Sequence, residues 1–369
     1  MMATYNILRY LARRNHHVTV YTTQLIGRAH RVPHSSLVNT NLTTRVHWSW
    51  IEGAFLSPTL TWELARLRVS QFDVVYVANC RNFPSTIGLL IGRKLSDHVV
   101  FAANGTLLAY PNVPGLSAMK TIAHRVQAIF LPGLLRHVSL ALAVSREEVR
   151  HYLSFGIDPS RIELVGNGVD LEIFKPGYTN FRQKLGLLDD FIICYVGRLD
   201  PIKGLTVLLE AFQLLKRVHG SSKLLFLGPD FGMKQILIRR ASEMKLQSHV
   251  LFVDPMPQEE LVSAYRAADV VVIPSYFEIF GLSALEAVAC GIPVIASDVG
   301  GLREIIQDGV NGYLVAPGNP SAIASKLLLL AENSKRATLS HNSAEGARRF
   351  DMDRVASKVE DALRRTAGC

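Results

Sequence analysis

Both halves of the chain alternate short apolar segments of strand length with longer segments of helical pattern. A strand that pairs in parallel with its predecessor is reached through a crossover, which is usually a helix, so this alternation predicts parallel sheets covered by helices. The alternation pauses at Phe174-Lys175-Pro176-Gly177, which is typical of a linker, and then restarts. We therefore predict an α/β chain with two tandem Rossmann-like domains that face a cleft.

The expected strands are short apolar runs, and the expected helices lie between them. In the first half the strands are His17–Tyr21, Asp73–Val77, Val99–Ala102, Ser139–Val144 and Arg161–Val165, with helices that include Ser85–Leu95 and Ser145–Leu153. In the second half the strands are Phe191–Val196, Lys223–Leu227, Val250–Val253, Val270–Ile273, Pro293–Ala296 and Gly312–Val315. The second set of helices is Gly204–Val218, Met233–Met244, Glu259–Ala267, Leu282–Ala289, Gly301–Gln307 and Pro320–Ala331.

The chain opens directly on a helical pattern with Ile7, Leu8 and Leu11 as its apolar stripe. In a doubly wound sheet the first strand is normally central, and the turn after it approaches the ligand. No such strand and turn precede this helix, and a sheet without its middle strand leaves two neighbours unpaired. We therefore expect the first domain to be incomplete at its N-terminus.

Apolar run length and cysteine spacing bear on the compartment. No run reaches the roughly 18–20 apolar residues that a membrane span needs, and the longest candidate, Ala128–Leu135, is interrupted by Pro132 and Gly133. The four cysteines lie far apart without the spacing of a zinc site or a disulfide framework. A reducing cytoplasm is the expected location, with peripheral attachment to the cytoplasmic face of a membrane as an open alternative.

The net charge of +9 is concentrated in the first half of the chain. Residues 1–175 hold 18 Lys and Arg against 10 Asp and Glu, whereas residues 176–369 hold 22 against 21. A basic half favours an anionic partner, such as a phospholipid surface or a lipid phosphate, although a solvated basic surface explains the excess equally well. Nucleic acid is not expected as a partner, because the chain has no recognisable nucleic-acid module or dense Lys/Arg run.

The strongest local pattern is the stretch from Ser275 to Glu286 (SYFEIFGLSALE), between an expected strand and an expected helix. The free N–H groups of Gly281, Leu282 and Ser283 would open the helix and form an anion site that the helix dipole strengthens. Glu278 precedes the helix and can project into the cleft. Glu286 can reach back from just inside the helix to the place of a ribose. The alternative, to which we give equal weight, is that Glu278 and Glu286 are an ordinary capping glutamate and an ordinary surface glutamate without a role in binding.

A second loop, Gly197-Arg198-Leu199-Asp200-Pro201-Ile202-Lys203-Gly204, directly follows another expected strand. Arg198 can bind phosphate oxygens bidentately, and Lys203 adds a point charge. A basic turn near helix carbonyls is the plainer alternative. Because ligands bind at the carboxyl ends of strands in open α/β sheets, two such loops in one domain support each other.

These residues resemble the motifs of glycosyltransferase family 4. Glu278–Glu286 looks like that family's E-x7-E motif, and Gly197–Gly204 resembles its Arg/Lys diphosphate loop. Further matches are Val144-Ser145 with Glu148, Asn167–Asp170 and Gly309–Val315. The resemblance implies a GT-B fold, a nucleoside-diphosphate-sugar donor with UDP or GDP as nucleotide, and retention of anomeric configuration without an essential metal or other cofactor.

The resemblance also implies domain boundaries. Residues 1–174 would form the acceptor-side domain, and residues 175–349 would form the nucleotide-sugar-binding domain. Residues 350–369 would form a C-terminal helix that crosses back to the first domain. The acceptor would be a glycan or a lipid-linked molecule.

The roles of individual residues follow from the same resemblance. Glu278 would contact the hydroxyl groups of the donor sugar, while Arg198 and Lys203 would neutralise the departing diphosphate, so these three are the expected catalytic residues. Glu286 would bind the nucleotide ribose. The expected donor-binding residues are Gly197, Gly228, Phe280, Gly281, Leu282, Ser283 and Glu286.

Two features bear on turnover. Family members often place a His at a strand end that resembles Phe101–Thr106, where this chain has Asn104. An Asn can donate a hydrogen bond to a sugar or an acceptor but cannot act as a general base, and a simple turn residue is equally consistent. With the missing first turn, this leaves a catalytically silent sugar-nucleotide-binding protein as the second hypothesis. A nicotinamide dehydrogenase is disfavoured, because no G-x-G-x-x-G turn opens either half.

The stretch Ser117–His137 mixes apolar with basic residues, and it is the candidate for contact with an anionic lipid surface. An ordinary packed helix is the alternative.

Overall fold

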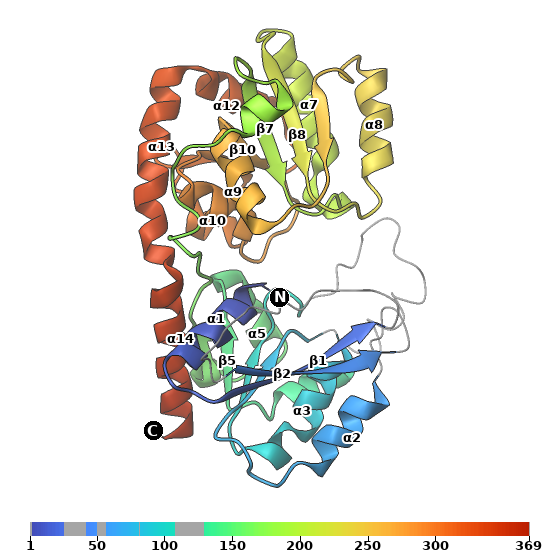
Figure 1. Ribbon diagram of the computed structural model, residues 1–369, viewed down its shortest axis with the longest axis vertical. Helices are drawn as coiled ribbons and strands as arrows, with labels where there is room; N and C mark the ends of the chain where they lie inside the picture. The colour runs from blue at the N-terminus through green and yellow to red at the C-terminus, as the bar shows by residue number, and fades with distance from the viewer. Residues whose placement is uncertain (1, 26–41, 50–56, 81, 108–128, 369) are drawn as a thin grey trace. The chain divides into compact units, whose positions relative to one another are not determined.

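The computed structural model describes residues 2–25, 42–49, 57–80, 82–107 and 129–368 (Figure 1). The chain forms two compact units. The first comprises Met1–Gly168 together with Met352–Cys369, and the second comprises Val169–Asp351. Each unit is built on parallel strands, so the prediction of an α/β chain with two Rossmann-like domains is confirmed.

The first unit contains two separate parallel sheets. Strands β1 (Val18–Leu25) and β2 (Leu42–Ser49) pair from Val18 with Leu42 to Leu25 with Ser49. Four further strands form the second sheet in sequence order: β3 (Val75–Ala78), β4 (Val99–Ala102), β5 (Leu140–Ala143) and β6 (Ile162–Leu164). Among the described residues, β1 pairs only with β2, and β3 pairs only with β4. Strand β2 escaped prediction because its polar Thr, Arg and His residues break up any continuous apolar run.

Helices cover both faces of the four-stranded sheet. They are α1 (Met2–Arg13), α3 (Phe83–Leu95), α5 (Arg146–Ser154) and α14 (Met352–Ala367), whereas α2 (Pro58–Arg66) packs on α3 and on the β1–β2 pair. Successive strand residues point to opposite faces, so Phe101 of β4 packs in a cluster with Leu89 of α3, while Val100 packs with Ile7 of α1 and Val359 of α14. The sheet is therefore buried on both sides, as parallel sheets require.

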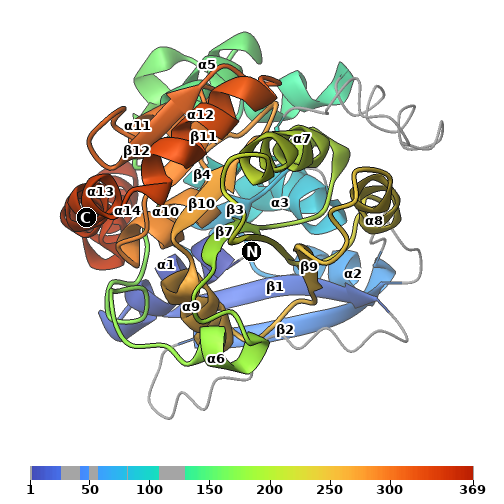
Figure 2. The same cartoon turned by 90° about the horizontal axis from the view of Figure 1, so that it is seen from above.

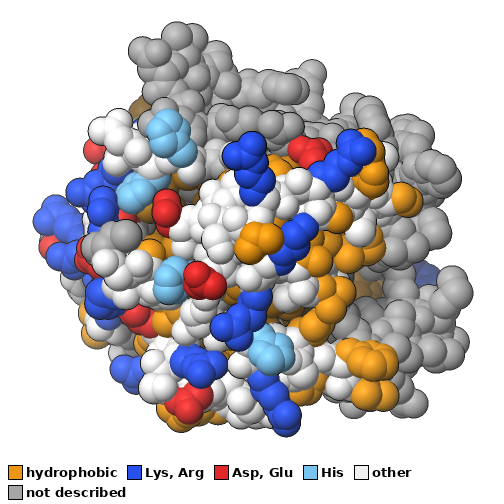
Figure 3. All heavy atoms as spheres, turned by 90° about the horizontal axis from the view of Figure 1, so that it is seen from below, with side chains coloured by type: hydrophobic (Ala, Val, Ile, Leu, Met, Phe, Trp, Pro, Cys, Tyr) orange, Lys and Arg blue, Asp and Glu red, His pale blue; other side chains and the backbone are white. Residues whose placement is uncertain are grey.

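Basic and apolar side chains share the outer surface of the first unit. Figure 3 shows the face on which Lys and Arg side chains alternate with exposed apolar ones. Trp62 on α2 is 59% exposed, and the Arg66 guanidinium lies over its ring at 3.5 Å from the centroid. Of the stretch Ser117–His137, residues 117–128 lie outside the described residues; Ile129 and Phe130 are exposed, whereas Leu131 and Leu135 are buried. The predicted lipid contact stays a prediction.

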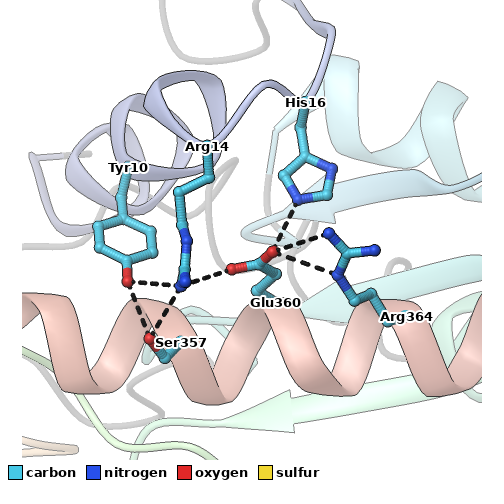
Figure 4. A network of polar contacts seen from close by, with 6 residues as sticks. All are labelled: Tyr10, Arg14, His16, Ser357, Glu360 and Arg364. Atoms are coloured by element: carbon cyan, nitrogen blue, oxygen red, sulfur yellow. Dashed lines mark hydrogen bonds and ion pairs between the residues drawn. The ribbon is translucent and has the colours of Figure 1, made fainter.

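A polar network fixes α14 on α1 (Figure 4). The carboxylate of Glu360, which is buried on α14, forms ion pairs with three side chains. The distances are 2.8 Å to Arg14 Nη1, 3.0 Å to His16 Nε2 and 3.1 Å to Arg364 Nη2. Tyr10 and Ser357 complete the network through a hydrogen bond of 2.8 Å between their hydroxyl oxygens. Burial raises the pKa of Glu360, but the hydrogen bonds from His16 and Arg364 and the charge of Arg14 outweigh it, so the net pKa lies below the ordinary value.

The second unit holds one six-stranded parallel sheet. In spatial order its strands are β12 (Gly312–Val315), β11 (Val294–Ser297), β10 (Val270–Ile273), β7 (Phe191–Val196), β8 (Ser222–Leu227) and β9 (Val250–Val253). The order runs outward in both directions from the β7–β10 pair, as in a doubly wound sheet. All six strands were predicted to within one residue at either end, because their continuous apolar runs are bounded by polar turns.

The helices of the second unit lie on both faces of its sheet (Figure 2). Helices α7 (Leu205–Lys216), α8 (Lys234–Glu243) and α12 (Pro320–Ala331) cover one face, and α9 (Gln258–Ala267), α10 (Leu282–Ala289) and α13 (Asn333–Ala347) cover the other. The short helices of this unit are α6 (Phe181–Leu185) and α11 (Leu302–Ile305), and its 3-10 turns are η2 (Pro201–Lys203) and η3 (Arg348–Phe350); the turn η1 (Pro159–Arg161) belongs to the first unit. Helices α2, α6 and α13 were missed, and α11 is shorter than the predicted Gly301–Gln307. Helix α13 lacks an apolar stripe, since only Leu339, Ser343 and Ala347 are buried.

The Glu360 network should make the first unit sensitive to acid. A carboxylate with a depressed pKa stabilises the folded state above its unfolded pKa, and this stabilisation is lost as the pH falls through the folded pKa. We expect Glu360→Gln to lower the free energy of unfolding at pH 7 by about 1 kcal/mol, because the partner cations are half exposed. The difference from wild type should shrink on acidification below the ordinary carboxyl range, as followed by urea denaturation.

Glu163→Gln is the matched control, because Glu163 pairs with Arg365 of α14 at 2.7 Å in a more exposed setting. It should change stability by no more than a few tenths of a kcal/mol. A difference between Glu360→Gln and wild type that persists unchanged at low pH would refute the ionic contribution of this network.

Candidate active site

The loops after β7 and β8 touch each other at the carboxyl edge of the second sheet. Gly197 donates its N–H to Leu227 O at 2.9 Å, and Leu199 donates to Pro229 O at 2.8 Å. At Gly228, where φ is +135°, an added Cβ would overlap the carbonyl oxygen of Gly197. Gly228 is thus needed for the close approach of the two loops, whereas a Cβ at Gly197 would meet the Tyr195 hydroxyl; both glycines were expected at the donor site.

The loop after β10 lies against the loop after β7. Tyr276 donates its N–H to Ile202 O at 2.9 Å, and Asp200 caps η2 by accepting the N–H of Ile202 at 3.1 Å. Lys203 Nζ forms an ion pair and hydrogen bond with Glu278 Oε1, and each side chain is only 15% exposed. Two of the three residues predicted to be catalytic, 75 positions apart in the chain, are therefore in direct contact.

Glu278 has a second partner. Ser275 Oγ donates a hydrogen bond to Glu278 Oε1 at 3.3 Å, and Ser275 itself is completely buried. The backbone carbonyl of Glu278 accepts the N–H of Gly301 at 3.2 Å from the loop after β11. The carboxylate is therefore bound by a cation and by a hydroxyl, and the backbone that carries it is fixed by the loop after β11.

Helix α10 begins directly after this carboxylate. Its N-cap residue, Gly281, has φ +101°, and within the described residues no side-chain hydrogen bond caps the first turn. The first-turn N–H groups include those of Leu282 and Ser283, which are partly buried. An uncapped helix start of this kind binds anions through its N–H groups and its dipole. The side chain of Phe280 is buried edge-on against Phe350, with ring centroids 6.0 Å apart.

Glu286 lies one turn further along α10. The hydroxyl of Tyr265, a fully buried residue of α9, donates to Glu286 Oε2 at 2.8 Å. Burial raises the pKa of Glu286 to about 7, and the hydrogen bond from Tyr265 opposes that rise. A carboxyl group poised near neutrality can accept hydrogen bonds from sugar hydroxyls once it is ionised.

Arg198 is the most exposed of the predicted catalytic residues. Its guanidinium lies 3.6 Å from Asp200 and 5.1 Å from the centroid of the Phe231 ring, and its side chain is 43% exposed. A cation that is neither buried nor tightly paired remains available to an incoming anion.

Asn104 belongs to the first unit, where it occupies a left-handed position with φ 49° in the turn after β4. Its amide nitrogen donates to Thr4 Oγ1 at 3.1 Å and to Ala102 O at 3.3 Å. The side chain therefore links the turn to helix α1 within the same unit.

Two partners of the expected site residues, Tyr265 and Ser275, are not identified by the sequence patterns. Tyr265 lies on the buried side of an amphipathic helix, where its ring is expected to belong to the hydrophobic core. A buried hydroxyl nevertheless needs a hydrogen-bond partner, and this requirement is the one signal of a nearby acceptor. Ser275 directly follows the Pro274 that ends a strand and reads as a turn residue. Only the tertiary structure brings each of them to a carboxylate.

Taken by themselves, the two units define a Rossmann-like α/β protein with cations and helix N–H groups at the carboxyl ends of its strands. This is the class that binds phosphorylated ligands at that edge.

Comparison with known families identifies the class more closely. Residues 2–173 match the model "Glycosyltransferase Family 4", and residues 178–349 match "Glycosyl transferases group 1". The two matches are consecutive and together span nearly the whole chain. The chain therefore belongs to the family 4 glycosyltransferases.

Curated relatives support this assignment. The chain is 36% identical over 229 residues to a D-inositol 3-phosphate glycosyltransferase of Acidothermus cellulolyticus, which covers 58% of this chain and 51% of that protein. It is also 36% identical over 233 residues to the protein of the same name from Mycobacterium bovis, with 60% and 48% covered. The chain thus spans about half the length of the curated relatives that it matches.

Solved structures share the fold. Sucrose-phosphate synthase from Thermosynechococcus elongatus superposes with a TM-score of 0.79 at 23% identity, covering 99% of this chain and 92% of that one. Anabaena HepE in complex with UDP-glucose gives a TM-score of 0.71 at 23% identity, with 88% and 86% covered. These likenesses agree with the predicted GT-B class. Among the described residues, no helix combines the length and apolar character that crossing a membrane requires.

The contact between the loops after β10 and β11 can be tested at Gly301. A Cβ at this position would overlap the carbonyl oxygen of Ile279 and approach Phe280 Cα, although φ is ordinary. We expect Gly301→Ala to destabilise the protein by at least about 2 kcal/mol, because backbone cannot move aside as a side chain can. Thermal unfolding followed by circular dichroism measures the effect.

Gly220→Ala is the control, since nothing lies within 4 Å of the added Cβ and its φ is not positive. The melting temperature of this variant should stay close to that of wild type or rise slightly. Equal melting temperatures for the two variants would contradict the close packing of the Glu278 loop.

Proposed function

We propose that this protein transfers a sugar, with retention of anomeric configuration, from a nucleoside-diphosphate sugar to a hydroxyl group of an acceptor. The observation that carries the proposal is the Lys203–Glu278 pair at the uncapped start of α10, with Glu286 one turn beyond it. One site thus offers a cation, free N–H groups and two carboxylates, which are the groups that a sugar diphosphate requires.

The diphosphate is the part of the donor that most needs stabilisation. As the bond to the sugar breaks, negative charge grows on the leaving diphosphate, and preorganised cations and N–H groups lower the energy of that transition state. Lys203, Arg198 and the first turn of α10 would supply them. With these groups in place, an essential metal ion is not required.

The sugar and the nucleotide ribose carry the hydroxyl groups. Glu278 would accept hydrogen bonds from hydroxyls of the donor sugar, and Glu286 would accept them from the ribose. Gly197 and Gly228 would let the backbone approach the donor, because neither has a side chain at the loop contact.

Retention follows from attack on the face that the leaving group vacates. The sugar becomes oxocarbenium-like, the acceptor hydroxyl approaches beside the departing diphosphate, and a diphosphate oxygen takes its proton. The bond from the sugar to the diphosphate breaks, the bond to the acceptor oxygen forms, and no protein nucleophile is needed.

The choice of substrates draws on the relatives. UDP-glucose is bound in the Anabaena structure, and the curated relatives are named for D-inositol 3-phosphate. We take a UDP-sugar as the first donor to test and D-inositol 3-phosphate as the first acceptor. GDP-sugars are the further donors to test, and glycans and lipid-linked molecules are the further acceptors. The first unit would bind the acceptor, and its basic surface would suit an anionic acceptor or a membrane surface.

Substitutions at the ion pair test the reaction. We expect Lys203→Ala and Glu278→Ala each to lower kcat by about 100-fold or more, the usual cost of losing one preorganised electrostatic group. Release of UDP from UDP-glucose, with and without acceptor, measures turnover, and circular dichroism checks the fold.

Arg240→Ala is the matched control, because Arg240 pairs with Glu210 at 3.3 Å on the neighbouring helices of the same unit. It should keep full activity. Full activity in both site variants would overturn the assignment. Binding of UDP-glucose by wild type without transfer to any acceptor and without hydrolysis would favour the silent binding protein.

The pH dependence of donor binding tests Glu286. Only the ionised carboxylate accepts from both ribose hydroxyls, so binding of UDP-glucose should strengthen as the pH rises through about 7. Tyr265→Phe removes a hydrogen bond that favours the ionised form, so its binding curve should move to higher pH. Isothermal titration calorimetry between pH 6 and pH 8.5 measures both curves.

Tyr178→Phe is the control for this experiment, because Tyr178 is 80% exposed in the same unit. Its binding curve should coincide with that of wild type. If the Tyr265→Phe curve also coincides with it, Glu286 is not the group that governs donor binding.

A further inference from the structure

A carboxylate joins the ends of two strands in the first unit. Glu148, on the first turn of α5, is completely buried. Its Oε1 accepts the N–H of Gly105 at 2.6 Å in the turn after β4, and its Oε2 accepts the N–H of Val144 at 2.9 Å at the end of β5. A glutamate at this helix position often serves as a cap, but the bond to Gly105 reaches 43 residues along the chain and is no part of a helix cap.

The turn that Glu148 holds is a demanding one. Asn104 and Gly105 have φ values of 49° and 81°, so two successive residues lie in the left-handed region. Asn is one of the few non-glycine residues that tolerate this conformation, and it still costs free energy unless neighbouring groups support it. The bond from Gly105 to Glu148 is the support at the second of these two residues.

Other contacts fix the flanks of the turn. The Tyr152 hydroxyl accepts the N–H of Ala103 at 2.8 Å and donates to Leu142 O at 2.9 Å. Thr106 closes the turn by donating its N–H to Ala103 O at 3.0 Å, and its hydroxyl oxygen accepts the N–H of Cys80 at 2.9 Å. The flanks are thus fixed by neutral groups, whereas the centre depends on a carboxylate.

Burying the ionised carboxylate of Glu148 costs free energy, because the charge loses its hydration. Burial raises the pKa of Glu148 to about 7, and the two backbone hydrogen bonds only partly offset the rise. Among the described residues, the titratable groups that interact with it are the phenols of Tyr76 on β3 and Tyr152 on α5, whose own pKa values are raised by burial, so both stay neutral. Within the part of the chain that the structure describes, no Lys or Arg pairs with Glu148. Each carboxylate oxygen accepts one of the two backbone N–H groups, which an amide, with a single acceptor oxygen, could not do.

We propose that Glu148 is a positioning residue for the acceptor side of the reaction: its ionised carboxylate holds the left-handed turn that carries Asn104 at the carboxyl edge of the first sheet. The inference rests on the proposed function, in which the first unit binds the acceptor. Protonation of Glu148 removes the charge that the Gly105 N–H binds, and the turn then relaxes. Acceptor binding therefore weakens on acidification, independently of the donor site.

The local effect can be read directly by NMR. The sequence contains three Asn-Gly pairs, at Gly105, Gly168 and Gly312, so labelling with ¹³C-carbonyl Asn and ¹⁵N-Gly selects three amide signals of the full chain. We expect the Gly105 amide proton to shift with a midpoint near pH 7 in wild type and to lose that titration in Glu148→Gln. The Gly168 and Gly312 signals serve as internal references. A Gly105 signal that does not move between pH 5.5 and pH 8.5 in wild type overturns the inference, whether or not the variant folds.

The kinetic effect separates positioning from simple stability. With UDP-glucose as donor and D-inositol 3-phosphate as acceptor, Glu148→Gln should raise the acceptor KM about tenfold, the usual scale for losing a hydrogen bond to a charged group. The dissociation constant of UDP-glucose should stay within about twofold of wild type, and the acidic rise of the acceptor KM near pH 7 should disappear.

Glu147→Gln is the matched control, since Glu147 lies on the same helical turn and bonds Arg150 at 2.5 Å instead of the turn. It should leave the acceptor KM unchanged. Active wild type with equal acceptor KM values for both variants overturns the inference on Glu148 but not the proposed function. Wild type that transfers to no acceptor overturns the proposed function, while the Gly105 titration still decides whether Glu148 holds the turn.

Discussion

Parallel pairing is the constraint on which the rest of the structure depends. When all strands of a sheet run the same way, every loop that follows a strand emerges at the same edge, however far apart the strands are in sequence. The loops after β7 and β10 are therefore neighbours, and Lys203 meets Glu278. In the first unit the same rule brings the ends of β4 and β5 together, and Glu148 joins them.

The two buried carboxylates with raised pKa values solve their desolvation differently. Glu286 has a neutral hydroxyl donor in Tyr265, which leaves its remaining acceptor capacity for a ligand. Both carboxylate oxygens of Glu148 accept hydrogen bonds from backbone N–H groups of its own unit, so little acceptor capacity remains for a substrate. In the proposed roles Glu286 would bind the ribose and Glu148 would position a turn, and the identity of the hydrogen-bond donors separates the two cases.

Sequence patterns predict most of the second unit because its strands are buried on both faces and read as continuous apolar runs. Strand β2 lacks such a pattern because Thr, Arg and His interrupt its apolar residues. Helix α13 lacks one because most of its residues are polar and no apolar stripe runs along it. The loop residues were found by their place after strands. The contact between Lys203 and Glu278, and the hydrogen bond from Tyr265, could not be predicted, because they depend on which loops become neighbours in space.

The Lys203–Glu278 pair also bears on how the proposed anion site can be stable before an anion binds. A lone cation at 15% exposure would be destabilising, and so would a lone carboxylate. Paired, each holds the other in place without water reorganisation. In the proposed function, an arriving diphosphate replaces the carboxylate as the partner of Lys203, and the hydroxyls of the sugar replace the ammonium as donors to Glu278. Both charges would then have partners before and after the exchange, so the bound state would hold no unpaired buried charge.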